Sequence, residues 1–375
     1  MENIPKRVAL VYDRVNKWGG AEQVLLALHE IFPDAPLYTA VHSPKNSSWA
    51  KVFPKVIPTF LQKFPWASSR HELYPWLTPL AFESLRFNEY EAVISVTSAD
   101  AKGIITNPGT FHLCYCLTPT RYLWSHYSEY LQTLSPLARF ISRPVYSYVK
   151  KWDLVAASRP DSYIAISGSV QERIKKYYGR DSQIVHPPVN VSRFSKTLKP
   201  SAMSNYFLYV GRLVAYKRVD IVIKVFNELG LPLVIVGTGE QEGNLRSQAG
   251  PHIHFAGFVS HEELISYYQN CKALIFFHEE DFGIVPVEAQ AAGKPVIALR
   301  AGGAMDTVIN GVTGVLLDDS SPKTLKKAVL EFDPKVFDPE VIKNHTSSFS
   351  RENFREKFVK VLGTEWKRYK NTFTS

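Results

Sequence analysis

The stretch from His278 to Glu288, HEEDFGIVPVE, places carboxylates on both sides of a glycine turn and a proline. The apolar run CKALIFF precedes it and is expected to be a buried strand, so that Glu280 follows the carboxyl end of that strand. Pro286 suits the first residue of a following helix, where its missing N–H costs nothing. Glu288 is then expected in the first turn of this helix, where the helix dipole favours a carboxylate.

Glu280 and Glu288 are separated by a loop that is too variable to form a tight general acid–base pair. They can instead accept hydrogen bonds from hydroxyl groups at two ends of one ligand, while the turn amides suit an anion or a sugar oxygen. In VGRLVAYKR, Arg212 and Lys217 follow another strand-like run and could hold a diphosphate. The combination predicts a nucleotide sugar, and ordinary surface charges are the structural alternative.

Gly19 and Gly20 follow the first strand-like run, RVALVYD, after a short loop. Glycines at such a place let backbone amides approach an anion at a helix N-terminus. A simple turn explains the pair equally well. The spacing is not the GxGxxG pattern, so the sequence does not indicate a dinucleotide.

The composition of the 375 residues, 45% hydrophobic and 21% charged, is typical of a globular protein with two domains. No apolar run reaches the roughly 18 to 20 residues that span a bilayer, and the first residues lack the pattern of a signal peptide. Three cysteines are too few for a disulfide framework, and Cys114 and Cys116 are expected in a core strand. We therefore expect a cytoplasmic protein. The net charge of +9 favours an anionic ligand or lipid over nucleic acid, for which no motif is present.

Short apolar strand-like runs alternate with amphipathic helical runs in both halves of the chain, which predicts two parallel sheets covered on both faces. The expected fold class is α/β, with two Rossmann-like parallel-sheet domains facing across a cleft that holds the ligand. We expect an acceptor-side domain over 1–198 and a nucleotide-sugar-binding domain over 199–355, joined by a linker rich in Pro, Ser and Lys. Residues 356–375 form one more amphipathic helix, for which a crossing back onto the first domain is one interpretation.

The E-x7-E element with its Phe-Gly, the following EAQAAGKPVIA and GGAMDTVINGVTGVLL, the Arg212–Lys217 pair and WGGAE together resemble retaining glycosyltransferase family 4 over nearly the whole chain. The resemblance implies the GT-B fold and a nucleotide sugar as co-substrate, with no cofactor and no metal. It implies that Arg212 and Lys217 stabilise the leaving diphosphate and that Glu280 holds the transferred sugar. Glu288 would bind the ribose hydroxyls. The donor-binding residues that it implies are Gly19, Gly20, Gly211, Phe282, Gly283, Ile284, Val285 and Glu288.

Two further stretches, HLCYCLTPTRYLWSHY and IVHPPVNVSRF, resemble the mannosyltransferase branch that builds O-antigen and other surface polysaccharides, usually from GDP-mannose. This likeness implies a lipid-linked or saccharide acceptor. The candidates for the acceptor and sugar side are Arg121, Tyr122 and His126. The branch commonly has a histidine before its Thr-Pro, where this chain has Leu117. Two interpretations follow: His126, His112 or a backbone carbonyl substitutes for it, or the acceptor is a different one.

The stretch RFISRPVYSYVKKW, residues 139–152, interleaves cations with aromatic residues. It has two interpretations: a peripheral contact with anionic lipid at the inner face of the plasma membrane, and a solvated helix face broken by Pro144.

Several other functions stay open beside mannosyl transfer. One is a UDP-sugar-dependent glycosyltransferase. A second is a nucleotide-sugar 2-epimerase, against which the E-x7-E element argues. A third is a carbohydrate phosphorylase, for which we find no convincing pyridoxal-phosphate lysine. The last is a catalytically silent subunit that binds sugar nucleotides, which Leu117 keeps open.

Overall fold

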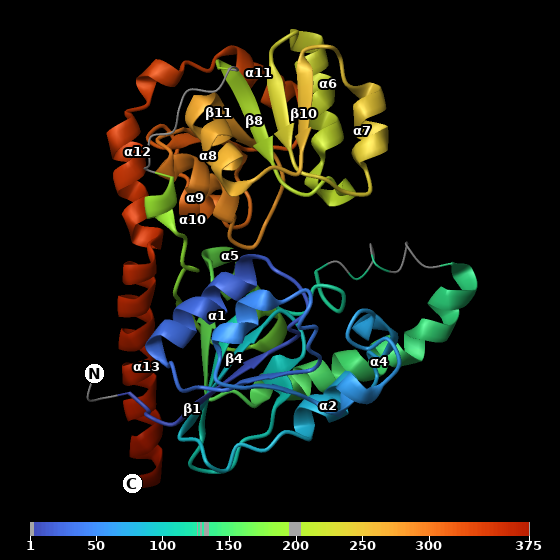
Figure 1. Ribbon diagram of the computed structural model, residues 1–375, viewed down its shortest axis with the longest axis vertical. Helices are drawn as coiled ribbons and strands as arrows, with labels where there is room; N and C mark the ends of the chain where they lie inside the picture. The colour runs from blue at the N-terminus through green and yellow to red at the C-terminus, as the bar shows by residue number, and fades with distance from the viewer. Residues whose placement is uncertain (1–3, 126, 128–129, 131–134, 195–203, 375) are drawn as a thin grey trace. The chain divides into compact units, whose positions relative to one another are not determined.

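The computed structural model describes residues 4–125, 127, 130, 135–194 and 204–374 (Figure 1). The chain forms two compact units. The first unit comprises Met1–Pro187 with Phe354–Ser375, and the second comprises Pro188–Asn353. Each unit is built around one parallel sheet, and each is described here by itself.

The first unit contains a seven-stranded parallel sheet in the order β3-β2-β1-β4-β5-β6-β7. The central strands are buried along their whole length, as expected for a parallel sheet covered on both faces. The strands are β1 (Val8–Tyr12), β2 (Leu37–Thr39), β3 (Val56–Pro58), β4 (Ala92–Thr97), β5 (Phe111–Cys116), β6 (Ser162–Ala165) and β7 (Gln183–Ile184). The helices are α1 (Gly20–Ile31), α2 (Thr78–Glu83), α4 (Pro136–Ser158), α5 (Gly168–Tyr178) and α13 (Arg351–Thr374), with short 3-10 helices η1 (Ser48–Val52), η2 (Phe60–Lys63), η3 (His71–Leu73) and η4 (Ala101–Gly103).

The apolar runs RVALVYD, PLYTAV, AVISVTS, FHLCYCLT and SYIAIS predicted every strand of this sheet except the two at its edges, β3 and β7. β3 is only three residues long and ends in a proline, and β7 has two residues, so neither contains an apolar run that a pattern could detect. Both cysteines of β5 are buried and not disulfide-bonded, which confirms their place in the core. Pro144 does not break α4, because the helix continues through it to Ser158.

The second unit contains a six-stranded parallel sheet in the order β10-β9-β8-β11-β12-β13. The strands are β8 (Tyr206–Val210), β9 (Leu233–Val236), β10 (Ile253–Gly257), β11 (Cys271–Phe276), β12 (Val296–Leu299) and β13 (Gly314–Leu317). The helices are α6 (Val219–Leu229), α7 (Glu242–Gln248), α8 (His261–Asn270), α9 (Ile284–Ala291), α10 (Ala304–Thr307), α11 (Pro322–Leu330) and α12 (Pro339–Thr346), with 3-10 helices η5 (Val191–Arg193), η6 (Ala215–Lys217), η7 (Pro334–Val336) and η8 (Ser347–Phe349).

Alternate residues of these strands point to two separate cores. One face of the sheet packs against α6, α7 and α11, and the other packs against α8, α9 and α10 (Figure 1). The strong apolar face of α6 explains the first core, and Gly230, in the left-handed conformation at φ 64°, ends that helix.

The units meet in the sequence at Pro187–Pro188, within the predicted linker but before residue 198. The residues after Pro188 join the second unit because the Val189 amide donates to the Phe349 carbonyl and Phe194 lies in the apolar core. The last helix, α13, passes into the first unit from Phe354 onward. Its aromatic side chains pack on β5, where Trp366 and Tyr369 contact Phe111.

The strand order in each sheet reverses at one point, between β1 and β4 in the first unit and between β8 and β11 in the second. Loops that follow the carboxyl ends of strands at such a reversal form the usual ligand site of an open parallel sheet. The described part of the chain includes no helix with the length and apolarity that a bilayer crossing demands.

Candidate functional site

A buried ion pair lies at the strand reversal of the second unit. The loop after β8 carries Lys217 and the loop after β11 carries Glu280, and the parallel pairing of these strands brings both loops to one edge. Lys217 Nζ lies 2.5 Å from Glu280 Oε1. The lysine side chain is buried, whereas the glutamate side chain keeps 25% of its surface exposed. The pair is therefore open to a ligand from the side of Glu280.

His278 is a third member of this cluster, and the sequence analysis assigned it no role. Its Nε2 lies 3.3 Å from Glu280 Oε1, and its ring is buried. Burial raises the pKa of Glu280, but the hydrogen bond from His278 and the charge of Lys217 outweigh it and lower this pKa to about 2. Burial also lowers the pKa of His278. The site therefore presents an ionised carboxylate that a neutral imidazole and an ammonium group hold in place.

Arg212 lies on the same loop as Lys217 but is exposed, and its guanidinium donates to the Tyr216 hydroxyl at 3.3 Å. Gly211, which follows β8 directly, lies under this loop. A side chain there would place a Cβ 3.1 Å from Lys217 Nζ and 3.2 Å from the Tyr209 hydroxyl. Glycine at this position therefore leaves the lysine room to reach Glu280.

The loop that carries Glu280 is supported by two glycines after β12, which the sequence analysis did not single out. The Gly303 amide donates to the Glu280 carbonyl at 2.8 Å. A Cβ on Gly302 would lie 2.1 Å from that carbonyl oxygen, and one on Gly303 would lie 2.1 Å from the Phe282 carbonyl oxygen. Only glycine permits this backbone-to-backbone packing. The signal was a Gly-Gly pair that follows strand β12 after only two residues, Arg300 and Ala301.

The start of α9 follows this loop. Gly283 caps the helix with φ 85°, in the left-handed region that favours glycine. Ile284 and Val285 are the first two helical residues, so their amides have no partner inside the helix. The prediction that Pro286 begins the helix is wrong, because it is the third helical residue. It is tolerated there because the first four N–H groups of a helix are unpaired in any case.

Glu288 lies in the second turn of α9, and its predicted place in the first turn is wrong because the helix begins at Ile284. The dipole is weak beyond the first turn, so another group must hold this carboxylate. The Tyr268 hydroxyl donates to Glu288 Oε2 at 2.9 Å. Burial raises the pKa of Glu288 to about 7, although the bond from Tyr268 and the charge of Arg193 oppose the rise.

In the first unit, the corresponding edge is occupied by the buried carboxylate of Asp13, directly after β1. The Thr97 hydroxyl donates to its Oδ1 at 2.8 Å, as the alignment of β1 with β4 requires. Further hydrogen bonds come from the backbone amides of Ser98, Asp100 and Ala101. Asp13 therefore holds the loop after β4 in place through these hydrogen bonds. This role was not predicted from the sequence.

A second buried pair, Lys102 with Asp153 at 2.5 Å, lies beside this loop. Thr120 and Trp124 also donate to the Asp153 carboxylate, each at 2.8 Å. Both members of the pair are nearly inaccessible to solvent, with 2% and 0% of their side-chain surface exposed. These contacts join η4 to α4, so the pair is structural.

Gly19 and Gly20 lie at the start of α1, as the sequence predicted, with Gly19 as the cap and Gly20 as the first helical residue. Their immediate neighbour is the buried carboxylate of Glu22, which accepts a 2.8 Å hydrogen bond from the Tyr12 hydroxyl. A Cβ on Gly19 would lie 3.2 Å from Glu22 Oε2. Burial raises the pKa of Glu22, while Tyr12 and the amides of Glu22 and Gly19 oppose the rise. Gly19 thus makes room for a carboxylate of the chain itself.

The structure describes two of the three candidates for the acceptor and sugar side. Arg121 and Tyr122 are half-buried in the turn after β5, where the Tyr122 ring lies 6.2 Å from that of Tyr146. His126 lies outside the described residues. His112 cannot serve as a substitute, because it is fully buried near the amino end of β5, where its Nε2 bonds to the Ser95 hydroxyl. Burial lowers the pKa of His112 to about 3.

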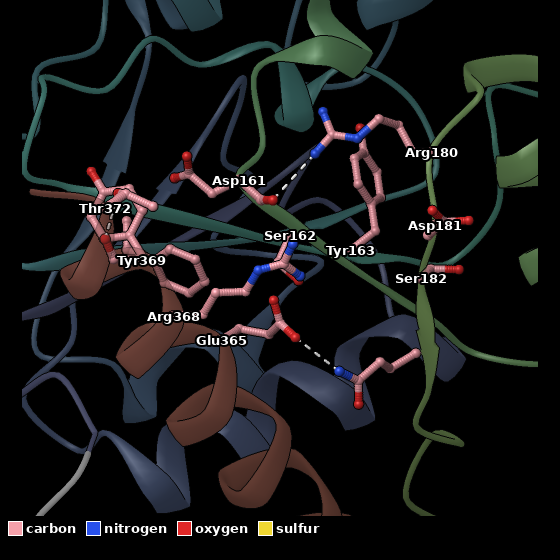
Figure 2. A pocket seen from close by; sticks show the side chains of 12 residues that line it. Asp161, Ser162, Tyr163, Arg180, Asp181, Ser182, Glu365, Arg368, Tyr369 and Thr372 are labelled. Atoms are coloured by element: carbon pink, nitrogen blue, oxygen red, sulfur yellow. Dashed lines mark hydrogen bonds between the residues drawn. The ribbon is translucent and has the colours of Figure 1, made fainter. Parts of the chain in front are cut away.

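A pocket of about 530 Å³ opens in the first unit between α13 and the amino ends of β5 and β6 (Figure 2). Its polar groups are largely engaged with one another: Arg180 donates to the backbone carbonyls of Pro160 and Asp161, and Gln183 donates to Glu365. It lies at the edge opposite the carboxyl ends of the strands. We therefore do not assign it to the site predicted from the sequence.

Residues 190–333, which lie in the second unit, match the sequence model of the family described as glycosyl transferases group 1. An uncharacterized glycosyltransferase of Methanocaldococcus jannaschii is 29% identical over 181 residues, which are 47% of this chain and 50% of that protein. A GDP-mannose-dependent alpha-mannosyltransferase of Corynebacterium glutamicum is 35% identical over 141 residues, 37% of this chain and 34% of that protein. The chain thus matches half or less of the length of these relatives.

The fold is similar to that of Anabaena HepE, solved in complex with UDP, with a TM-score of 0.69 and 18% identity over 96% of this chain and 100% of that one. At this identity the likeness bears on the fold alone. It confirms the predicted class, α/β with two Rossmann-like parallel-sheet domains of the GT-B type.

Proposed function

We propose that this chain is a retaining glycosyltransferase that moves a hexose from a nucleoside diphosphate to an acceptor hydroxyl. The observation that carries the proposal is the Lys217–Glu280 pair at the strand reversal of the second unit, within the residues that match glycosyl transferases group 1. One cation and one ionised carboxylate, together with unpaired amides at the start of α9, suit a ligand that combines phosphates with hydroxyls.

The proposed reaction breaks the bond between the anomeric carbon and the diphosphate oxygen and forms a bond from that carbon to the acceptor oxygen. The proton of the acceptor hydroxyl passes to the leaving diphosphate. Lys217 and Arg212 stabilise the negative charge that develops on the diphosphate. Glu280 binds hydroxyls of the sugar, and Glu288 binds the ribose. The chemistry needs no metal, because the two side-chain cations supply the charge.

The donor that we propose is GDP-mannose. The partial likeness to the Corynebacterium glutamicum mannosyltransferase supports it, together with the two stretches that resemble the mannosyltransferase branch. A UDP-sugar is the second candidate.

For the acceptor we propose a lipid-linked or saccharide hydroxyl, reached by a cytoplasmic enzyme at the membrane surface. Phe140 and Ile141 on α4 are 71% and 62% exposed, and Arg143 and Lys151 on the same helix are also exposed. Lys150 is less suited to bind lipid than the sequence suggested, because its Nζ lies 4.4 Å from the centre of the Trp124 ring. Apolar side chains beside cations are typical of helices that bind anionic bilayers.

Vesicle sedimentation tests this contact. The unchanged protein should bind phosphatidylglycerol vesicles and not phosphatidylcholine vesicles. Replacing Arg143 and Lys151 with serine should abolish binding, whereas the same change at Lys323 and Lys327 on α11 removes equal charge and should have no effect. Equal binding by both double variants would contradict a contact through α4.

The proposed function itself is tested by thermal unfolding with GDP, UDP, GDP-mannose and UDP-glucose, followed by transfer assays. A ligand that binds only the folded state at a hundredfold excess over its dissociation constant adds about 2.7 kcal/mol of stability. We expect stabilisation by GDP and GDP-mannose, and transfer with retained anomeric configuration in the presence of EDTA. Stabilisation by UDP alone would change the donor. No stabilisation by any of the four would refute the proposed site, and conversion of the nucleotide sugar without an acceptor would indicate an epimerase.

A further inference from the structure

Tyr268 contacts the Glu288 carboxylate and adds one residue to the candidate site. Tyr268, on α8, is fully buried, and its hydroxyl lies 2.9 Å from Glu288 Oε2 on α9. The sequence assigned Glu288 a role but gave no reason for its orientation. The contact joins residues on two helices that pack on the same face of the sheet.

The ring of Tyr268 is held rigidly. It packs edge-on against Phe194 with the ring centres 5.6 Å apart, inside the core formed with Cys271 and Ala289. The register of α8 is set at its start by a complete capping box, in which Ser260 and Glu263 bond to each other's backbone amides. The hydroxyl is therefore delivered to Glu288 from a fixed position.

Glu288, by contrast, is only half-buried. Among the residues that the structure describes, the bond from Tyr268 is the hydrogen bond that its carboxylate accepts, and it uses Oε2. Oε1 remains available for a ligand. A carboxylate with one oxygen fixed and the other available suits a hydroxyl donor and cannot rotate away when the ligand is absent.

We propose that Tyr268 is a positioning residue of the nucleoside site, whose hydroxyl holds Glu288 so that Oε1 accepts a hydrogen bond from a ribose hydroxyl of the donor. This role rests on the proposed function. It predicts that Tyr268 contributes to affinity only through the ribose hydroxyls and contributes nothing to the binding of base or phosphates.

The test measures dissociation constants by calorimetry for GDP and 2′,3′-dideoxy-GDP, and for UDP and its dideoxy analogue. Tyr268→Phe removes the hydroxyl alone. At pH 8, above the pKa of Glu288, a hydrogen bond to its charged carboxylate is worth enough to change affinity by about tenfold or more. We expect Tyr268→Phe to weaken GDP by about tenfold and dideoxy-GDP by less than twofold. Glu288→Gln should behave alike, and the double variant should be no weaker than Glu288→Gln.

Tyr206→Phe is the matched control. Tyr206 lies in the same core and is also fully buried, but its hydroxyl donates to the Tyr267 backbone carbonyl at 2.9 Å and not to Glu288. This variant should lose comparable stability and keep the preference for the ribose nucleotide unchanged.

Three outcomes would overturn the role of Tyr268. Equal weakening of GDP and dideoxy-GDP would make the tyrosine a merely structural residue, and unchanged affinity would show that its hydroxyl does not matter. Either result would leave the proposed function standing, because the unchanged protein would still bind nucleotide. Failure of the unchanged protein to bind GDP or UDP would overturn the proposed function and this role together.

Discussion

The two units use the same edge of the same kind of sheet in opposite ways. In the first unit, the charged groups after β1 and β4 are buried and bonded to the chain, as the amides around Asp13 and the Lys102–Asp153 pair show. In the second unit, Glu280 keeps a quarter of its side-chain surface exposed beside a buried lysine.

The comparison separates charged groups that stabilise the fold from charged groups that are accessible to a ligand. An ion pair whose two members are both inaccessible to solvent contributes little to net stability, but removing one member costs several kcal/mol of stability. A pair with one exposed member can exchange that partner for a ligand at small cost. Under the proposed function, Lys217 and Glu280 carry the chemistry, whereas Asp13, Lys102 and Asp153 hold the loops of the first unit in place.

The greatest effect on activity is expected from the removal of the Lys217 ammonium group. Lys217→Met should lower transfer turnover by about 10²- to 10³-fold, because one preorganised group that stabilises developing charge is typically worth this much. Steady-state rates with saturating donor provide the measurement. Lys326→Met is the control, since Lys326 forms a partly exposed pair with Glu228 in the same unit. Turnover near that of the unchanged protein would refute the assignment of Lys217.

Breaking the Lys102–Asp153 ion pair should destabilise the first unit without changing the binding of the donor. Asp153→Asn leaves the Lys102 ammonium buried without its carboxylate, which costs about 3–5 kcal/mol. Hydrogen exchange should then accelerate in peptides from β4 and α4 but not in those from β8 and β11. Asp181→Asn removes the exposed partner of Lys175 and should change neither set. Faster exchange in both units would contradict the division into frame and site.

A gain in stability that depends on pH is expected at Asp100. Burial, together with the charge of Asp13, raises its pKa from the ordinary 3.8 to about 7. Between about pH 4 and pH 7 the folded chain therefore holds a proton that the unfolded chain has released, so stability falls as pH rises through this window. Asp100→Asn cannot ionise and should be more stable than the unchanged protein at pH 8, by roughly 1.4 kcal/mol for each unit by which folding raises the pKa of Asp100.

Urea unfolding of both proteins at a series of pH values measures this difference. The advantage of Asp100→Asn should shrink as the pH falls and vanish near pH 4. Asp181→Asn, which changes an exposed carboxylate, should show no such slope between pH 5 and pH 8. An advantage that is independent of pH would mean that the aspartate does not titrate in this window.

Much of the fold could be predicted from local patterns. Runs such as VALVY and YFLYV are apolar over whole strands, and a chain that alternates them with amphipathic helices has few alternatives to parallel sheets. The loops with Lys217 and Glu280 follow two such strands, so their meeting at one edge follows from the fold class. The edge strands β3 and β7 of the first sheet were missed, because β3 ends in a proline after two apolar residues and β7 has only two residues.

The two parallel sheets and the E-x7-E element can be recognised from the amino-acid sequence, because hydrophobic periodicity and glycine or proline turns are local properties. Three contacts could be found only from the fold: His278 and Lys217 share one oxygen of Glu280, Tyr268 donates to Glu288, and Asp13 holds the loop after β4. Most of these contacts join residues on different elements, and strand register and helix packing bring them together. The spacing of residues along the sequence does not predict contacts of this kind.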